Sequence, residues 1–139
     1  MIRHLVALTC ASLILIPEAG QAWRSFNRQE VLPVSEGVFE VVNDVASSAA
    51  DFWCSAGDYA YREMRTEAVQ RVYIWRGIGP SVNRPGKKAV QFSLTPPEGV
   101  STEPGYTLSV KAEGDNMRAG SAQQYCFGNG PEDPGIWHP

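Results

Sequence analysis

Apolar and polar side chains alternate along short stretches of the chain, which predicts β-strands at residues 71–76, 89–94 and 106–110. The first stretch is also rich in the β-branched and aromatic residues that strands favour. The side chains expected to face the core are Val90, Phe92 and Leu94 in the second stretch and Tyr106, Leu108 and Val110 in the third. Strict alternation is typical of a sheet with one face in water, and therefore of antiparallel strands.

Two further β-rich stretches, residues 29–34 and 38–42, are separated by Ser35-Glu36-Gly37. Three connecting residues that end in glycine are typical of a β-hairpin with a bulge. Pro33 cannot donate a backbone hydrogen bond, so its strand is expected at the edge of the sheet. The two stretches therefore predict a hairpin near the start of the folded domain.

One segment, residues 48–64, has helical periodicity, with its apolar side chains along one arc. Ser48 and Asp51 match a capping box, which places the helix start. The arc includes small residues that would let the helix approach the sheet closely, namely Ala56, Gly57 and Ala60. Such a contact would offset the cost of a mid-helix glycine, about 1 kcal/mol. The opposite arc, expected in water, holds Asp51, Ser55, Asp58 and Arg62.

The first 22 residues match a secretory signal peptide. Arg3 supplies a positive start, residues 5–16 form an apolar run, and Gly20-Gln21-Ala22 places small residues before a cleavage site at Trp23. The run is too short to span a bilayer, which needs about 20 apolar residues. An uncleaved anchor or a buried core helix is the alternative. Cleavage predicts an exported protein, periplasmic or secreted, with no membrane span.

Two cysteines, Cys54 and Cys126, remain after the predicted cleavage. Paired cysteines in an exported chain oxidise, so we predict one disulfide between them. The chain-entropy model gives about 4 kcal/mol of stabilisation for a loop of that length. A reactive thiol is the alternative, but it would want a His partner or a Cys-x-x-Cys spacing. Residues 121–126 are expected to form a short helical turn that carries Cys126 to the main helix.

Length, composition and charge narrow the classes of function. A chain of 139 residues suits one domain, which we place at residues 23–127, before a flexible Gly/Pro-rich tail at 128–139. Hydrophobic residues at 43% and charged residues at 19% are typical of a globular protein. The net charge of −3 argues against a nucleic-acid binder. Two histidines in total leave little for a zinc site, so no metal or cofactor is expected.

Catalytic patterns are weak in this sequence. Gly86-Lys87-Lys88 lacks both the earlier glycine and the following hydroxyl of a phosphate loop. His138 is the penultimate residue of the predicted tail and would make a poor general base. Asp51 and Asp58 are the obvious carboxylate pair for a glycosidase-like reaction. Both are expected in water, however, where neither pKa would rise as a general acid requires.

Two features point to a binding surface. The loop at residues 76–88 has no acidic residue and carries Arg76, Arg84, Lys87 and Lys88. Such a patch suits an anionic partner, although a solubilising loop is the favoured alternative. In the strand at 71–76, Val72 and Ile74 share one side, so the other side carries Arg71, Tyr73 and Trp75. This stripe would be a platform for sugars or a partner protein if it faces water. If it is covered it is core, which we favour.

The segment Phe52-Trp53-Cys54-Ser55-Ala56-Gly57-Asp58-Tyr59, with a later strand and a late cysteine, resembles a set of small exported bacterial proteins with no assigned activity. A similar Phe-Trp-Cys-x-Ala-Gly-Asp-Tyr segment recurs in them, and the likeness extends to about Leu94. The resemblance implies no reaction, ligand or catalytic residue. It agrees with the export predicted from the leader.

These patterns predict an α+β fold in which one amphipathic helix packs on an antiparallel sheet of about five strands, with one disulfide. A β-sandwich with a helical insertion is the alternative. For function we expect a non-enzymatic binding or interaction module whose partner is an envelope protein or an anionic glycan. An inhibitor of a secreted hydrolase, presenting the loop at 77–88 or 95–105, and a carboxylate-dependent hydrolase are the two alternatives.

Overall fold

The computed structural model describes residues 22–128, and the predicted leader and tail lie outside this range except for Ala22 and Gly128. The strands are β1 (Trp23–Arg24), β2 (Glu30–Ser35), β3 (Val38–Val42), β4 (Arg71–Pro80), β5 (Lys88–Ser93) and β6 (Asn116–Arg118). The helices are α1 (Ala49–Asp58), its π-helical continuation η1 (Tyr59–Glu63), α2 (Ala119–Gln124) and the 3₁₀ turn η2 (Tyr125–Phe127).

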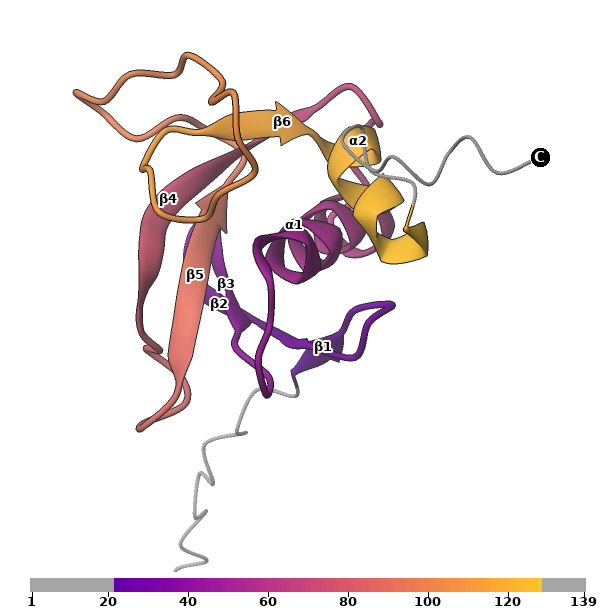
Figure 1. The fold of residues 1–139 in the computed structure, drawn as a ribbon, viewed down its shortest axis with the longest axis vertical. Coiled ribbons are helices and arrows are strands. Elements are labelled where there is room, and N and C mark those ends of the chain that lie inside the picture. Colours follow the sequence, from indigo (N-terminus) through magenta and orange to yellow (C-terminus); the bar gives the residue numbers. More distant parts are fainter. Residues whose placement is uncertain (1–21, 129–139) are drawn as a thin grey trace, which may run out of the picture.

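The strands form one antiparallel sheet in the order β1-β2-β3-β5-β4-β6. The sheet curls around α1 like half a barrel, with β1 and β6 at its two edges, and α2 closes the open side (Figure 1). The predicted α+β class is confirmed, with six strands in the described part of the chain in place of about five. Two of the six were not predicted, the two-residue strand β1 and the three-residue strand β6, and one predicted strand is absent.

The core lies between the sheet and α1, as the alternating pattern predicted. Val72 and Ile74 of β4 and Val90 and Phe92 of β5 are all fully buried in it. The β2–β3 hairpin is also confirmed, with a register shift between Pro33 and Ser35. Strand β2, which contains Pro33, is an edge strand only in part. The short strand β1 pairs with its first two residues, and Pro33 lies beyond that pairing.

The capping box that begins α1 is confirmed. The Ser48 N–H donates to Asp51 Oδ2 at 2.8 Å, and the Asp51 N–H donates to Ser48 Oγ at 3.2 Å. The helical path runs on through η1 to Glu63, close to the predicted end. Local sequence signals therefore define this helix well.

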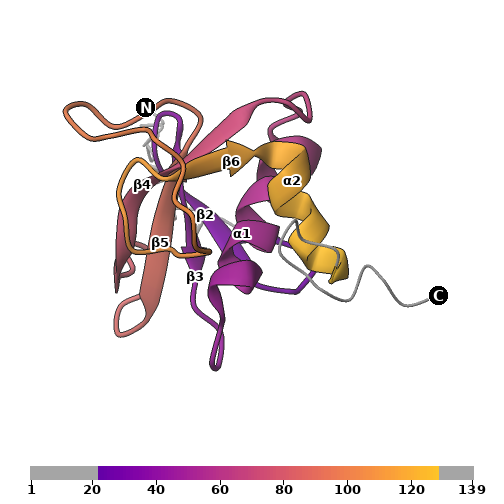
Figure 2. The ribbon, with the colours of Figure 1, turned by 45° about the horizontal axis from the view of Figure 1, so that its top comes forward.

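The prediction of a wet helix face is wrong for two of its residues. Ser55 is 0% exposed and Asp58 is 1% exposed, so α1 is buried on both sides from Phe52 to Asp58. The second side is covered by α2 and by the connection between β1 and β2 (Figure 2). Neither covering segment is adjacent to α1 in sequence, so helical periodicity carried no sign of them.

Gly57 marks a close approach to α2, and the expectation that it faces the sheet is wrong. A Cβ at this position would lie 2.5 Å from the Gln123 nitrogen and 2.6 Å from the Ala122 Cβ. The predicted disulfide joins the same two helical regions, with Cys54 and Cys126 Cα atoms 4.8 Å apart. The helix pair is therefore held by a covalent link beside its closest backbone contact.

The third predicted strand, residues 106–110, is wrong. This stretch has no strand structure, and Tyr106 is fully exposed in place of pointing inward. Val110 is buried, and the Trp53 indole N–H donates to the Ser109 carbonyl at 3.0 Å. The place beside β4 belongs to β6, which leads directly into α2 and so to the disulfide. The disulfide therefore favours β6, in place of residues 106–110, as the strand that pairs with β4.

The face of the sheet that points away from α1 is also less wet than expected. On it Gln91 is 6% exposed, Ser93 is 1% exposed and Glu40 is 0% exposed. The tip of the β4–β5 hairpin, residues 81–87, bonds to Glu40 on this face. The same tip carries basic residues that the sequence singled out.

Candidate functional site

A buried carboxylate holds the tip of the β4–β5 hairpin in place. Glu40 accepts hydrogen bonds from the Ser81 hydroxyl at 2.7 Å and from the backbone N–H groups of Val82 and Asn83 at 3.0 and 2.9 Å. The Asn83 side-chain amide adds a bond at 3.1 Å. Burial raises the pKa of Glu40, but these hydrogen bonds outweigh it and leave the pKa below its ordinary value. The tip is therefore fixed by an ionised, fully bonded carboxylate.

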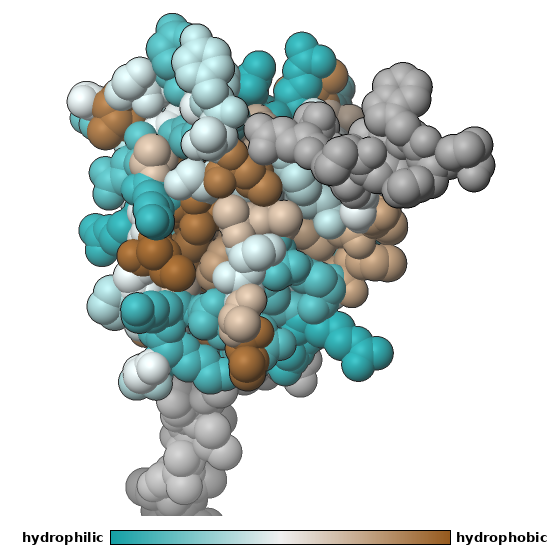
Figure 3. Space-filling view, viewed as in Figure 1, coloured by the Kyte–Doolittle hydropathy of each residue, from teal (hydrophilic) through white to brown (hydrophobic). Residues whose placement is uncertain are grey.

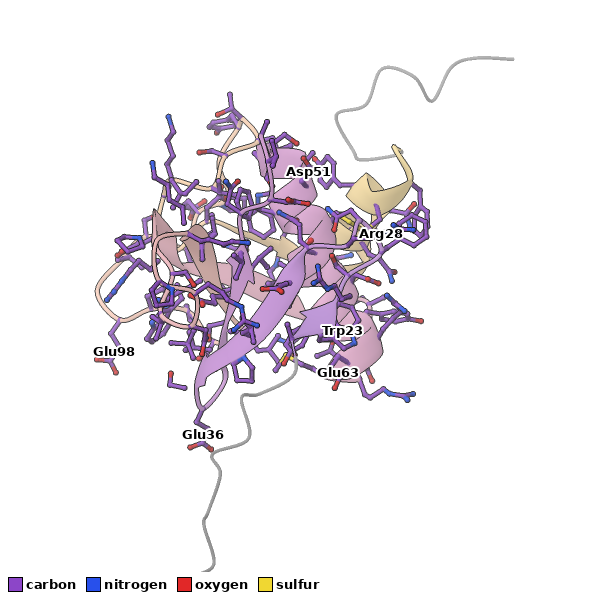
Figure 4. All side chains as sticks on the ribbon, turned by 90° about the horizontal axis from the view of Figure 1, so that it is seen from below. Trp23, Arg28, Glu36, Asp51, Glu63 and Glu98 are labelled. Atoms are coloured by element: carbon purple, nitrogen blue, oxygen red, sulfur yellow. A yellow bond between two sulfur atoms is a disulfide. The ribbon has the colours of Figure 1, made fainter. Side chains whose placement is uncertain are left out.

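This fixed tip faces a small polar hollow at the end of the molecule where β1, the β3–α1 connection and the hairpin meet. The hollow has a volume of about 90 Å³ and is lined by Arg24, Arg28, Gln29, Glu30, Val42, Asn43, Asp44 and Lys87. We call it the basic hollow. Figure 3 shows this lower end of the molecule as mainly hydrophilic. Figure 4 looks onto the same end and places Arg28 far from Glu36, which lies at the β2–β3 turn.

Glu30 is the centre of charge in the basic hollow. Its carboxylate accepts from Arg84 Nε at 2.8 Å and from Arg24 Nη2 at 3.2 Å. The hydrogen bond from Arg84 and the nearby positive charges, that of Lys87 among them, lower the pKa of Glu30. Glu30 therefore stays ionised at neutral pH and serves as a shared counter-ion for cations from two parts of the chain.

Two cations of the hollow form no salt bridge, although the charge of Lys87 acts on Glu30. Among residues 22–128, Arg28 and Lys87 make no ion pair and no side-chain hydrogen bond, whereas Arg24 and Arg84 are paired with Glu30. Arg28 also has a positive φ of 68°, an uncommon conformation for a residue other than glycine. Its backbone N–H donates to the Ser25 carbonyl at 2.8 Å, which holds this tight turn together.

The floor of the hollow is rigid because Gln29 is buried in a polar network. Its amide nitrogen donates to Ser47 Oγ at 2.9 Å, and its amide oxygen accepts from Ser55 Oγ at 2.5 Å. Asn27 joins the network through a bond from its amide to the Gln29 oxygen at 3.1 Å. Ser55, expected in water, is in fact one of the residues that anchor this turn to α1.

The structure divides the predicted binding surface among separate places. Lys87 lines the basic hollow, Arg84 bonds to Glu30 in its wall, and Lys88 follows Lys87 in β5. Arg76 lines a different depression with Lys111 and Glu113. Arg71 and Tyr73 line another at the start of β4, and Arg71 donates to Asn116 Oδ1 at 3.1 Å. Tyr73 and Trp75 are half-buried and are not part of the core cluster.

Sequence reasoning missed Arg24 and Arg28. They lie in the stretch between the leader and the first predicted strand, where no periodic pattern drew attention to them. The available signal of a basic site was that both arginines precede Glu30, the first acidic residue of that stretch. Nothing local indicates that they line one hollow with Lys87, because that arrangement depends on how the sheet curls.

Asp51 and Asp58 do not form the catalytic carboxylate pair that a hydrolase would need. Asp51 caps α1, and Asp58 accepts bonds from the Phe26 N–H at 2.8 Å, from Gln123 Nε2 at 3.1 Å and from Arg62. Burial raises the pKa of Asp58, but these bonds outweigh it and lower the pKa below its ordinary value. A general acid needs the opposite shift. The expectation that Asp58 is solvated is wrong, yet its role is structural.

The described residues contain no cluster of three or more His, Cys, Asp or Glu side chains able to hold a metal. Within residues 22–128, none of the helices combines the length and the apolar character that a membrane crossing requires. Fold and site together define a disulfide-bonded α+β domain with a basic hollow at one end. Comparisons with protein-family models, curated proteins and solved structures find no match.

Proposed function

We propose that this protein is an exported, non-enzymatic binding module whose ligand places an anionic group in the basic hollow. The observation that carries the proposal is the meeting of Arg28 and Lys87, two unpaired cations from distant parts of the chain, at one hollow. Clustered positive charge attracts anions, and a guanidinium recognises carboxylate, sulfate or phosphate groups through paired hydrogen bonds.

The lining also favours a particular class of ligand, an acidic glycan. Besides its cations, the hollow is lined by the amide of Asn43 and the carboxylates of Glu30 and Asp44. Amides and carboxylates accept hydrogen bonds from sugar hydroxyls, which a purely basic surface cannot do. A volume of about 90 Å³ corresponds to a few water molecules, so it admits one acidic group and its nearest hydroxyls.

Rigidity supports binding at this place. The Glu40 bonds fix the hairpin tip that carries Lys87, and the Gln29 network fixes the turn that carries Arg28. Groups that are already in position lose little conformational entropy when a ligand arrives. The proposed site therefore does not depend on a rearrangement.

Export is part of the proposal. It is supported by the leader pattern of the first 22 residues and by the disulfide between Cys54 and Cys126. The resemblance of the Phe52–Tyr59 segment to small exported bacterial proteins supports the same interpretation. N-terminal sequencing of protein purified from its native source should begin at Trp23, and a start at Met1 would contradict cleavage.

Isothermal titration with a matched pair of sugars tests the proposed ligand class. We expect a glucuronate oligosaccharide to bind and the neutral glucose oligosaccharide of equal length to bind at least tenfold more weakly. Arg28→Ala combined with Lys87→Ala should abolish the difference, while Arg118→Ala, at an exposed arginine outside the hollow, should preserve it. Equal binding of both sugars, or an unaffected double variant, would reject the proposal.

A second candidate function, inhibition of a secreted hydrolase, has one observation in its favour. The hairpin tip at 81–87 is held from beneath by Glu40, and its Val82 side chain is exposed. A rigid exposed loop is what a hydrolase inhibitor presents to an active-site cleft. Assays against lysozymes and serine proteases should show inhibition that Val82→Asp removes. No inhibition of any of them would end this alternative.

A further inference from the structure

Two exposed aromatic rings lie against each other next to the turn that carries Arg28. Phe26 is 57% exposed and Phe127 is 51% exposed, and their ring centroids are 4.9 Å apart. In each of the other ring contacts among residues 22–128, both rings are buried or half-buried. Apolar surface left in water costs free energy, so a contiguous exposed pair indicates a binding surface. We call it the phenylalanine pair.

One buried carboxylate fixes the backbone beneath both rings. Asp58 accepts a hydrogen bond from the Phe26 N–H at 2.8 Å and another from Gln123 Nε2 of α2 at 3.1 Å. Asp58 is 1% exposed, so water does not compete for these bonds. Phe127 directly follows Cys126, and the disulfide at that position ties η2 to α1. The two rings are therefore held together in the absence of a ligand.

The phenylalanine pair and the basic hollow share one turn. The Arg28 N–H donates to the Ser25 carbonyl at 2.8 Å, so Phe26 and Arg28 belong to the same four-residue turn. Their Cα atoms are only about 6 Å apart, because the two ends of such a turn lie within about 7 Å of each other. Figure 4 places Arg28 on the side of the molecule where α2 and η2 lie. Since Arg28 lines the basic hollow, the pair borders that hollow.

The residue between Phe26 and Arg28 anchors the turn to α1. Asn27 Nδ2 donates to the Asp51 carbonyl at 3.0 Å, and Asn27 Oδ1 accepts from Ser55 Oγ at 2.7 Å. Both partners belong to α1, the helix to which the disulfide also ties η2. A ligand can therefore contact Arg28 and the rings together with little loss of conformational entropy in the protein.

We propose that the phenylalanine pair is a second subsite for the acidic glycan, and that it holds the sugar next to the one whose acid group lies in the basic hollow. This inference rests on the proposed function. A sugar ring has a face of C–H groups that packs on an aromatic ring, while its hydroxyl groups stay in water. A single acidic sugar uses only the hollow, whereas an oligosaccharide uses both subsites. The pair therefore makes binding depend on the length of the glycan.

The lining of the adjoining hollow favours a sugar over an acidic peptide as the occupant. Asn43, Asp44 and Glu30 lie beside the cations of the hollow and can accept hydrogen bonds from hydroxyl groups. A sugar acid brings hydroxyl groups next to its carboxylate, whereas an acidic side chain of a peptide brings the carboxylate alone. The two carboxylates of the lining would repel that group without any compensating bond.

The test follows backbone-amide chemical shifts of the whole protein during titration with glucuronate and with its tetrasaccharide. We expect glucuronate to shift the signals of Arg28 and Lys87, and the tetrasaccharide to shift that of Phe127 as well. Phe26→Ala and Phe127→Ala should each lower the ratio of tetrasaccharide to monosaccharide affinity about fivefold, the usual effect of one aromatic contact. Tyr106→Ala, at an exposed aromatic residue on another loop, is the matched control and should preserve the ratio.

Each failure has its own signature. An unchanged ratio in both phenylalanine variants would reject the second subsite and leave the basic hollow as the binding site. The absence of shifts at Arg28 and Lys87 with either sugar would reject the proposed function and this inference together. Phe26→Leu, which keeps an apolar side chain without a ring, should lower the ratio as Phe26→Ala does. A dimer in sedimentation that Phe127→Ala dissociates would show that a second copy covers the rings, and would reject the subsite.

Discussion

Arg84 donates from Nε to Oε2 of Glu30 at 2.8 Å, although 54 residues separate the two in sequence. This ion pair ties the tip of the β4–β5 hairpin, which carries Lys87, to the start of β2, where Glu30 lines the basic hollow. The pair is partly exposed, so its own contribution to stability is small. Its importance lies in where it places Lys87.

Glu40→Gln should destabilise the protein and loosen the hairpin tip. The carboxylate has two acceptor oxygens facing Ser81, Val82 and Asn83, whereas an amide would turn an NH₂ group toward one of these donors. We expect a loss of about 2 kcal/mol in the free energy of unfolding, measured by urea titration. Hydrogen exchange at the Val82 and Asn83 amides should accelerate. Glu36→Gln, in the exposed β2–β3 turn, is the control and should change neither measurement.

Stability should fall as the solution is acidified. The pKa values of Glu40 and Asp58 are lowered in the folded protein, so each carboxylate contributes stability above its ordinary pKa. That contribution is lost as the pH falls through the lowered folded-state pKa. Urea titrations from about pH 7 down to about pH 3 should show this decline. Asp58→Asn should be less stable at neutral pH and should show a shallower decline. An unchanged slope would contradict the assignment.

Gly57→Ala should be destabilising even though alanine favours helices. An added Cβ would lie 2.5 to 2.7 Å from the backbone nitrogen of Gln123, the Cβ of Ala122 and the carbonyl of Ala119. Overpacking against backbone costs about 1–3 kcal/mol, which exceeds the gain of about 1 kcal/mol in helix propensity. Thermal unfolding measures the balance. Gly79→Ala, whose Cβ would have its nearest neighbour at 3.7 Å, should be close to neutral.

Removal of the disulfide should cost a large part of the stability. The bond between Cys54 and Cys126 closes a loop with a sequence separation of 72 residues. The double substitution of both cysteines by alanine should lower the free energy of unfolding by about 4 kcal/mol in the chain-entropy model. Reduction of the wild-type protein should have a similar effect, and reduction of the variant should have none. A variant as stable as the wild type would show that packing between α1 and α2 is sufficient.

Much of the fold was predictable because its signals are local. Period-two alternation correctly placed Val72, Ile74, Val90 and Phe92 in the core, and the capping box correctly began α1 at Ser48. The same logic failed at residues 106–110, where alternation is present but β6 takes the neighbouring position on β4. A periodic pattern shows that a segment can be a strand, and competition among segments decides whether it becomes one.

The sequence alone determined which side chains are apolar enough to be buried, where the helix begins and which two cysteines can pair. Tertiary structure alone decided that Asp58 and Glu40 are buried and that Arg28 and Lys87 line the same hollow. The reason is physical: the cost of burying a carboxylate is offset by donors that come from distant segments. Local periodicity contains no information about those donors, so the basic hollow forms only when the sheet has curled around the helix.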